Sequence, residues 1–328
     1  MIRQLLIHKS GCFDPYFNIA TEKRLLETVR SGCCVLYLWQ NQNTVVIGRN
    51  QNAWVECRTS LLEEEGGHLA RRLSGGGAVF HDLGNLNFTF IMPQEDYDLD
   101  KQLAVIQEAC AMAGIPVERS GRNDVLANGC KFSGNAFYHS GGKAYHHGTL
   151  LVDADMEKLG RYLTPSKAKL EAKGVQSVRS RVINLKELCP SLTCQVMGQY
   201  MEAAFQKVYG LPAEALPLTA EDMADIEDSA KTLGSWDWLY GQKLPFSVSF
   251  EDRFSWGGIL LELNVQNGCI ESLQVFSDAM DWELPRVITD ALTGCRFTKA
   301  DMRKALQTVL TDSQIAEDLC GLIEEQDL

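Results

Sequence analysis

The stretch Arg71-Arg-Leu-Ser-Gly-Gly-Gly-Ala-Val-Phe-His81-Asp-Leu-Gly-Asn85 is the most informative part of this 328-residue chain. Three consecutive glycines cost backbone entropy, so they are kept where positive φ or a close backbone approach is needed. The amide N–H groups of such a loop attract anions, and Arg71 and Arg72 bring positive charge beside it. We therefore predict an anion-binding loop between two strands.

Two common nucleotide-binding motifs do not fit this loop. A Walker loop ends in Gly-Lys-Ser or Gly-Lys-Thr, and neither the loop nor Gly142-Lys143-Ala144 has that ending. The dinucleotide fingerprint G-x-G-x-x-G requires a glycine where this chain has Phe80. Both common nucleotide folds therefore lose support.

The segments around the loop predict helices mixed with antiparallel strands. Asp14 and Pro15 form a cap and a favoured first residue for one helix. The glycine turns near 129 and 142 predict an antiparallel meander over 124–152. We expect helices at 17–29, 60–65, 100–113, 155–163, 167–173, 195–209 and 219–233, and strands at 35–39, 44–48, 86–92, 258–265 and 269–276. This mixture favours an α+β fold, with a doubly wound parallel sheet as the alternative.

Composition and charge narrow the class of protein. A content of 45% hydrophobic and 23% charged residues is typical of a globular protein, and a net charge of −12 argues against a general binder of nucleic acid or membranes. No apolar run approaches the length that spans a bilayer, and the start lacks a signal peptide's apolar stretch. Eleven scattered cysteines without a CxxC pair favour a reducing, cytoplasmic location.

The acidic charge is unevenly distributed, which suggests two domains with a border near Pro245. Residues 246–328 hold 6 basic and 15 acidic residues, a net charge of −9. Residues 1–245 hold the other 25 basic and 28 acidic residues, a net charge of −3. We therefore expect a larger domain at 1–245, followed by a small acidic domain at 246–328.

Several motifs together resemble the lipoate–protein ligase family. They are the glycine-rich stretch at 71–85, GRNDVLANGCKFSG at 121–134 and HHGTLL at 146–151. Segments at 14–22, 45–57, 172–185 and 253–258 are also similar to the family, in the same order. The resemblance implies a biotin/lipoate–protein ligase-like catalytic domain, related to class II synthetases, with a small α+β C-terminal accessory domain.

The resemblance also implies an activity and its partners. Members of the family activate lipoic acid with ATP to lipoyl-AMP and transfer the lipoyl group to the ε-amine of a lysine. The acceptors are lipoyl-domain proteins, namely E2 subunits of 2-oxoacid dehydrogenases and the glycine cleavage H protein. ATP is a cosubstrate, Mg²⁺ is expected, and no prosthetic group, nucleic acid or membrane is implied.

The family's site residues transfer to matching positions of this chain. The resemblance assigns ATP binding to Arg72, Gly77, Ala78, Val79, Phe80 and Lys131. It assigns lipoate binding to Ser74, Gly75, Gly76, His81 and Lys131, and an adenylate-covering loop to Ser177, Arg179 and Arg181.

Lys131 and Asp124 are the predicted catalytic residues. Attack of a carboxylate on the α-phosphorus brings two anions together, so a mobile positive charge such as Lys131 stabilises the transition state. Asp124 is a candidate ligand for Mg²⁺ or a group that helps the acceptor amine lose its proton. An Asx turn or a salt bridge is the structural alternative for Asp124.

Other interpretations of the site remain open. Cys130, beside Lys131, allows an octanoyl or lipoyl transferase of the same fold that uses a cysteine. A lipoyl-domain binding module that has lost activation is a non-enzymatic alternative. His81, His146 and His147 suggest zinc, but hydrogen bonding within the sheet is favoured because cysteine and carboxylate partners at ligand spacing are missing.

Overall fold

The computed structural model describes residues 1–328 except 50, 121–123, 164–181, 241–245, 278, 280, 282, 311–312 and 327. The chain forms two compact units. The larger unit comprises Met1–Gln51 and Gly66–Gly234, and the smaller unit comprises Asn52–Glu65 and Ser235–Leu328. The smaller unit thus starts before the expected border and also takes in a segment from the N-terminal part of the chain.

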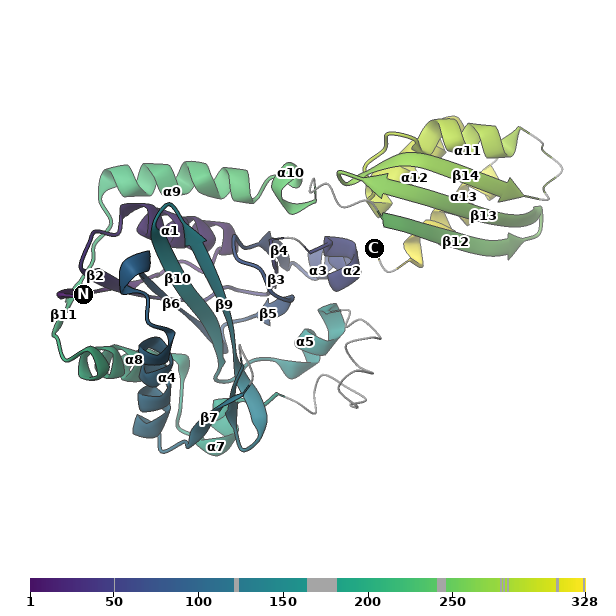
Figure 1. The fold of residues 1–328 in the computed structure, drawn as a ribbon. Helices are drawn as coiled ribbons and strands as arrows, with labels where there is room; N and C mark the ends of the chain where they lie inside the picture. Colours follow the sequence, from purple (N-terminus) through teal and green to yellow (C-terminus); the bar gives the residue numbers. More distant parts are fainter. Residues whose placement is uncertain are drawn as a thin grey trace. The chain divides into compact units, whose positions relative to one another are not determined.

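The larger unit is built around a mixed sheet (Figure 1). Among the described residues, eight strands follow the order β11-β1-β2-β6-β10-β9-β8-β7, and a second sheet has the order β4-β3-β5. The strands are β1 (Gln4–Lys9), β2 (Cys33–Trp39), β3 (Thr44–Ile47), β4 (His68–Arg71), β5 (Val79–His81), β6 (Asn85–Pro93), β7 (Val117–Ser120), β8 (Asp124–Ala127), β9 (Cys130–Ser140), β10 (Lys143–Leu151) and β11 (Ala213–Ala215). The helices are α1 (Pro15–Thr28), η1 (Gln94–Asp96), α4 (Leu99–Met112), α5 (Met156–Tyr162), α7 (Leu185–Leu188), α8 (Cys194–Tyr209) and α9 (Ala220–Leu233).

The two faces of the large sheet have different roles. Successive side chains of a strand point to opposite faces, so Leu36 and Leu38 of β2 face one way while Tyr37 and Trp39 face the other. Leu36 and Leu38 belong to the main core, together with side chains of α4 and α8 such as Phe205. Helices α1 and α9 lie on the opposite side of the sheet (Figure 1). The face that carries Tyr37 and Trp39 also holds the polar side chains described below.

Local sequence signals explain many of these elements. The Asp14 carboxylate accepts hydrogen bonds from the backbone N–H groups of Tyr16 and Phe17, and Pro15 starts α1. Asn128 and Gly129 adopt φ of 50° and 74°, as a tight hairpin turn requires. The predicted meander is confirmed, because β9 pairs antiparallel with both β8 and β10.

Several strands were not predicted, and one predicted helix lies outside the described residues. Strand β1 pairs parallel with β2 and β11, adding parallel pairs to a sheet expected to be antiparallel. Strands β7, β11 and β12 were also not predicted, whereas β4 and β5, whose bounds were not predicted, are the two strands expected on either side of the glycine-rich loop. The helix expected at 167–173 is not described. The α+β class is confirmed, since parallel and antiparallel pairs share one sheet.

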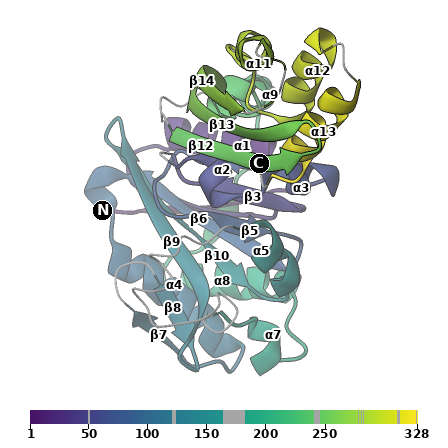
Figure 2. The same ribbon diagram turned by 90° about the vertical axis from the view of Figure 1, so that its right-hand side faces the viewer.

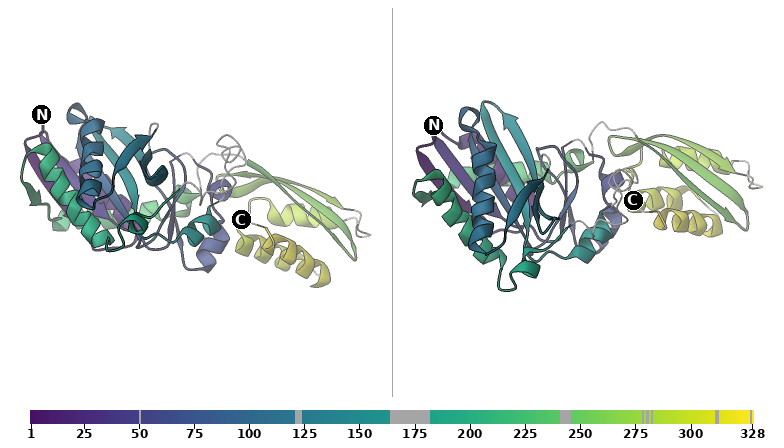
Figure 3. Two further views of the ribbon diagram at one scale, coloured as in Figure 1. Left: turned by 90° about the horizontal axis from the view of Figure 1, so that it is seen from below. Right: turned by 60° about the horizontal axis from the view of Figure 1, so that its bottom comes forward.

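The smaller unit is a sheet covered by helices on one face (Figures 2 and 3). Its elements are α2 (Ala53–Glu56), α3 (Thr59–Glu64), α10 (Trp236–Leu239), β12 (Phe246–Phe254), β13 (Gly257–Gln266), β14 (Cys269–Ser277), α11 (Leu284–Leu292), α12 (Lys299–Val309) and α13 (Ser313–Glu324). The Trp54 ring lies 4.9 Å from that of Tyr240 and 5.4 Å from that of Phe297. These aromatic contacts explain why 52–65 packs with the C-terminal segment. No helix among the described residues is long and apolar enough to cross a membrane.

Candidate active site

A row of residues across the large sheet forms the floor of the site. Trp39 on β2 is opposite Asn87 on β6, which is opposite Thr149 on β10. The Gly134 N–H of β9 donates to the Thr149 hydroxyl over 3.2 Å, and Gly134 is opposite Asp124 on β8. Directly opposed residues share a face of the sheet. The row therefore leads from an aromatic side chain at one end to a carboxylate at the other.

Two cavities meet above this row. The first has a volume of about 210 Å³ and reaches Trp39, His81 and Asn87. The second has a volume of about 410 Å³ and is lined by apolar side chains, including Phe80 and Leu159. Both cavities are lined by Ala78, Val79, Asp124, Lys131, Gly134 and Thr149. Ligands in the two cavities would thus meet beside the same lysine and carboxylate.

Lys131 and Asp124 form an ion pair at this junction. The Lys131 Nζ lies 2.7 Å from the Asp124 Oδ1, and the two side chains are 37% and 34% exposed. A Cβ atom on Gly134 would lie 3.0 Å from the Lys131 Nζ. The glycine therefore leaves the space in which the lysine side chain lies across the strand. The pair agrees with the salt-bridge alternative for Asp124 and keeps a positive charge at the junction.

The buried guanidinium of Arg72 holds the loop formed by residues 74–77, here called the glycine loop. Its Nη2 donates to the Gly75 and Gly77 carbonyls over 2.8 and 2.7 Å, and its Nε donates to the Ser74 hydroxyl over 3.1 Å. Burial lowers the pKa of Arg72 to about 10, which leaves it charged at neutral pH. Arg72 lines the first cavity, and its predicted contact with ATP stays a prediction.

The glycine loop also rests on the residues that follow β3. The Arg49 N–H donates to the Ser74 carbonyl over 2.9 Å. A Cβ atom on Gly48 would lie only 2.3 Å from the Gly76 carbonyl oxygen, and Gly76 has φ of 95°. Glycine is needed at position 48 because the two backbone segments touch.

Replacing Gly48 by alanine should displace the glycine loop. The added methyl group cannot coexist with the Gly76 carbonyl, and overpacking of this kind costs about 1–3 kcal/mol. We expect Gly48→Ala to weaken the lipoate binding that the family resemblance predicts for this loop, as measured by calorimetry. Gly11→Ala is the matched control because a Cβ atom at Gly11 meets nothing within 4 Å. Equal affinities of the two variants would contradict the expected displacement.

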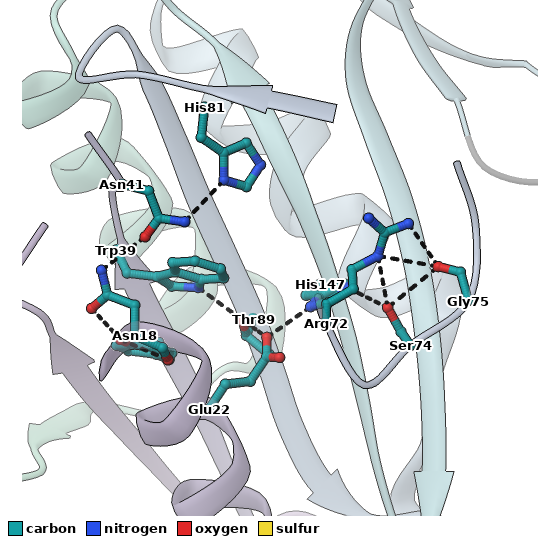
Figure 4. A network of polar contacts seen from close by, with 11 residues as sticks. Asn18, Glu22, Trp39, Asn41, Arg72, Ser74, Gly75, His81, Thr89 and His147 are labelled. Atoms are coloured by element: carbon teal, nitrogen blue, oxygen red, sulfur yellow. Dashed lines mark hydrogen bonds and ion pairs between the residues drawn. The ribbon is translucent and has the colours of Figure 1, made fainter. Parts of the chain in front are cut away.

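A chain of buried hydrogen bonds connects the glycine loop to helix α1 and strand β2 (Figure 4). The Ser74 Oγ and Glu22 Oε1 each lie 2.8 Å from a ring nitrogen of His147, Nε2 and Nδ1 respectively. The Thr89 hydroxyl donates to Glu22 Oε1 over 2.7 Å, and the Trp39 indole N–H donates to Thr89 over 3.1 Å. The network fixes Trp39 and the loop relative to each other.

The three histidines considered for zinc lie in separate hydrogen-bonding environments. His81 contacts Asn41, while His146 lies between Gln102 and Asn135 at 3.0 and 2.8 Å. Burial lowers the pKa of His81 and of His146 to about 3, so both are neutral at physiological pH. In the described part of the chain, no three His, Cys, Asp or Glu residues are grouped so as to hold a metal ion.

The structure brings most of the predicted site residues together. The first cavity is lined by Arg72, Gly76, Gly77, Ala78, Val79, His81, Asp124 and Lys131, and the second also by Phe80. Ser74 and Gly75 contact Arg72 in the glycine loop. The predicted adenylate-covering residues Ser177, Arg179 and Arg181 lie outside the described residues.

Several residues of the site were not singled out from the sequence. They are Glu22, Trp39, Asn87, Thr89 and Thr149, all on the polar face of the sheet or on α1. One signal was available, because Asn87 and Thr89 alternate with apolar residues in a strand whose every residue is buried. Polar residues on one face of a fully buried strand indicate either a hydrogen-bond network or a ligand.

Comparison with known families agrees with this geometry. Residues 14–206 match the lipoyl protein ligase A/B catalytic domain. Residues 243–324 match the bacterial lipoate protein ligase C-terminus. Together, the two matches span most of the N-terminal and the C-terminal parts of the chain.

Individual relatives match over nearly the whole chain. It is 41% identical to lipoate-protein ligase A of Psychrobacter cryohalolentis, over 92% of this chain and 91% of that protein. It is 38% identical to lipoate-protein ligase A of Bdellovibrio bacteriovorus, over 98% and 100%. A crystal structure of P. falciparum LipL1 in complex with lipoate covers 98% of this chain and 99% of its own, with 27% identity and a TM-score of 0.62. The chain belongs to the lipoate–protein ligase family.

Proposed function

We propose that this protein is an ATP-dependent lipoate–protein ligase. The observation that supports this most directly is the position of Lys131 and Asp124, which line both cavities. An acid in the first cavity and a nucleotide in the second would present their reacting groups to the same lysine. The named relatives are lipoate-protein ligases A, and one solved relative holds lipoate.

In the first half-reaction, an oxygen of the lipoate carboxylate attacks the α-phosphorus of ATP. A bond forms between that oxygen and phosphorus, and the bond to the β-phosphate oxygen breaks, releasing pyrophosphate. Lys131 neutralises the repulsion between the two anions and stabilises charge on the phosphoryl oxygens. The glycine loop, whose Gly76 and Gly77 line the first cavity together with Lys131, would add the positive potential of its backbone N–H groups.

In the second half-reaction, the ε-amine of an acceptor lysine attacks the carbonyl carbon of lipoyl-AMP. The new amide bond forms, the bond to the AMP oxygen breaks, and the amine loses a proton. This chemistry needs no covalent intermediate on the enzyme. The acceptors are lipoyl-domain proteins, including E2 subunits of 2-oxoacid dehydrogenases and the glycine cleavage H protein.

Asp124 suits a magnesium ion that accompanies ATP. Mg²⁺ is commonly held by one or two carboxylates together with phosphate oxygens and water. A single partly exposed carboxylate at the junction of the cavities fits that pattern. The ion would screen phosphate charge, while Asp124 would position it and release Lys131 toward the reacting oxygens.

Two further assignments accompany this function. Residues 1–245 are the catalytic domain and 246–328 the accessory domain, in line with the separate matches at 14–206 and 243–324. The location is the cytoplasm, which suits a chain whose eleven cysteines are all described and all free.

Exchange of labelled pyrophosphate into ATP tests the proposal. With purified protein and Mg²⁺, exchange should appear when lipoate is added and should stay at background without it. The assay isolates the first half-reaction because it requires no acceptor protein. Lack of lipoate-dependent exchange in protein that is folded would rule out activation of lipoate by ATP.

A further inference from the structure

Two buried N–H groups at the far end of the first cavity lack a hydrogen-bond partner. His81 is 4% exposed and Asn87 is 1% exposed, and both line the cavity. Within the described residues, neither the His81 Nε2 nor the Asn87 Nδ2 contacts a protein acceptor. Buried polar atoms of this kind need a partner, and a cavity-lining position indicates that the partner is a ligand.

The hydrogen-bond network determines which nitrogen of His81 carries the proton (Figure 4). The Asn18 side-chain N–H₂ lies 2.9 and 3.0 Å from the backbone carbonyls of Gln40 and Cys12, which only accept. An N–H₂ group has two hydrogens for these three acceptors, so one N–H is shared, and the Asn41 atom that faces it at 3.0 Å is the acceptor Oδ1. This contact turns the Asn41 N–H₂ toward the His81 Nδ1, 3.2 Å away.

A neutral imidazole that accepts at one nitrogen has its proton on the other. Since Asn41 donates to the His81 Nδ1, the proton is on Nε2. Burial, with the charges of Arg72 and His147, lowers the pKa of His81 to about 3 and keeps the ring neutral. His81, which lines the cavity, therefore carries a fixed Nε2–H donor.

Asn87, on the floor formed by the large sheet, supplies a second donor beside the same cavity. In the amide orientation of this structure, its Oδ1 accepts a hydrogen bond from the Asn85 Nδ2 over 2.9 Å, and both its N–H₂ and the Asn85 Oδ1 lack a partner among the described residues. Asn87 on β6 and Lys131 on β9 are separated by two strand spacings, or about 10 Å across the sheet. The donors thus lie well away from the lysine that would meet the carboxylate of an acid.

The chemical nature of the tail decides whether these donors are satisfied. A saturated tail would displace water and leave both N–H groups buried without acceptors, which is costly. Sulfur atoms are weak acceptors and would restore part of the lost hydrogen bonding. The cavity is therefore suited to a tail that is mainly apolar but ends in acceptor atoms.

We propose that His81, oriented by Asn41, and Asn87 select an acid whose far end carries hydrogen-bond acceptors, such as the two dithiolane sulfurs of lipoate. A saturated acid of the same shape is then disfavoured. His81 and Asn87 contact the ligand directly, and Asn41 is a positioning residue. The selection depends on the proposed function only in assuming that the acid occupies the first cavity.

Equilibrium binding without ATP tests this selection. Calorimetry with the full chain compares lipoate, octanoate and 5-cyclopentylpentanoate, in which methylene groups replace both ring sulfurs. We expect lipoate to bind about tenfold more tightly than the cyclopentyl acid, the size of one unsatisfied buried donor. In His81→Phe and Asn87→Leu the ratio should fall toward one, mainly through tighter binding of the cyclopentyl acid. His139→Phe, at an exposed histidine, should keep the wild-type ratio.

A second measurement does not depend on any variant. The ¹⁵N NMR shifts of His81 should show a protonated Nε2, which should shift on addition of lipoate and not of the cyclopentyl acid. Asn41→Leu should lose the fixed tautomer and the preference together. Equal affinity of the wild-type protein for the two acids, or a proton on Nδ1, would overturn the selection. If lipoate supports pyrophosphate exchange but binds no better than the cyclopentyl acid, only the selection is wrong; if lipoate neither binds nor supports exchange, both proposals fail.

Discussion

Lys131→Ala is expected to lower the rate of lipoate-dependent pyrophosphate exchange by at least about a hundredfold. The Nζ lies at the junction of the two cavities, 2.7 Å from Asp124 and in the space left by Gly134. Removing it takes away the one Lys or Arg among the described residues that lines both cavities, where the carboxylate and the phosphates are proposed to meet. The loss should appear mainly in kcat, because the interaction strengthens as charge develops on the phosphoryl oxygens.

Cys130→Ala is the matched control for Lys131→Ala. Cys130 is the neighbouring residue on β9 and is half-buried, so its replacement tests local disturbance of the strand. We expect exchange close to the wild-type rate for Cys130→Ala. The opposite pattern, with exchange lost in Cys130→Ala and kept in Lys131→Ala, would support an acyl transferase that uses Cys130 as its nucleophile.

The parts of the fold that the sequence predicts are those with strong local signals. The cap at Asp14 and the positive-φ turn at Asn128 and Gly129 are local signals, because each involves only residues that are close together in the sequence. Both were found where expected. The glycine loop and Lys131 were predicted to share a site, and the first cavity contains Lys131 and Gly76. Here the residue types themselves restrict what the backbone and the chemistry allow.

The remaining features depend on contacts between distant parts of the chain. Strand β11 has only three residues, Ala213–Ala215, and exists because β1 pairs with it. Glu22 is a charged residue in the middle of a helix, and nothing nearby in sequence indicates that it accepts from Thr89 and contacts His147. The inclusion of 52–65 in the smaller unit similarly depends on aromatic contacts such as that between Trp54 and Tyr240.

Arg71→Met should have the largest effect on stability, lowering the free energy of unfolding by about 3 kcal/mol. Arg71 is 2% exposed, and its Nη1 lies 3.2, 3.1 and 2.6 Å from the carbonyl oxygens of Gly48, Arg49 and Gln51. A methionine fills a similar volume but donates no hydrogen bond, so the Arg49 and Gln51 carbonyls would lose this donor, while the Gly48 carbonyl keeps the Gln51 N–H. Urea unfolding measures the change.

Arg119→Met provides the control for Arg71→Met, because it removes an arginine of the same unit at the surface. Arg119 is 44% exposed and pairs with Asp100, and such pairs contribute less than about 1 kcal/mol. An equally small loss in Arg71→Met would mean that water replaces the guanidinium as a donor.

Since the Arg49 N–H donates to the Ser74 carbonyl, disorder around Arg49 should extend to the glycine loop. Arg71→Met should therefore weaken lipoate binding as well as stability, whereas Arg119→Met should change neither by much.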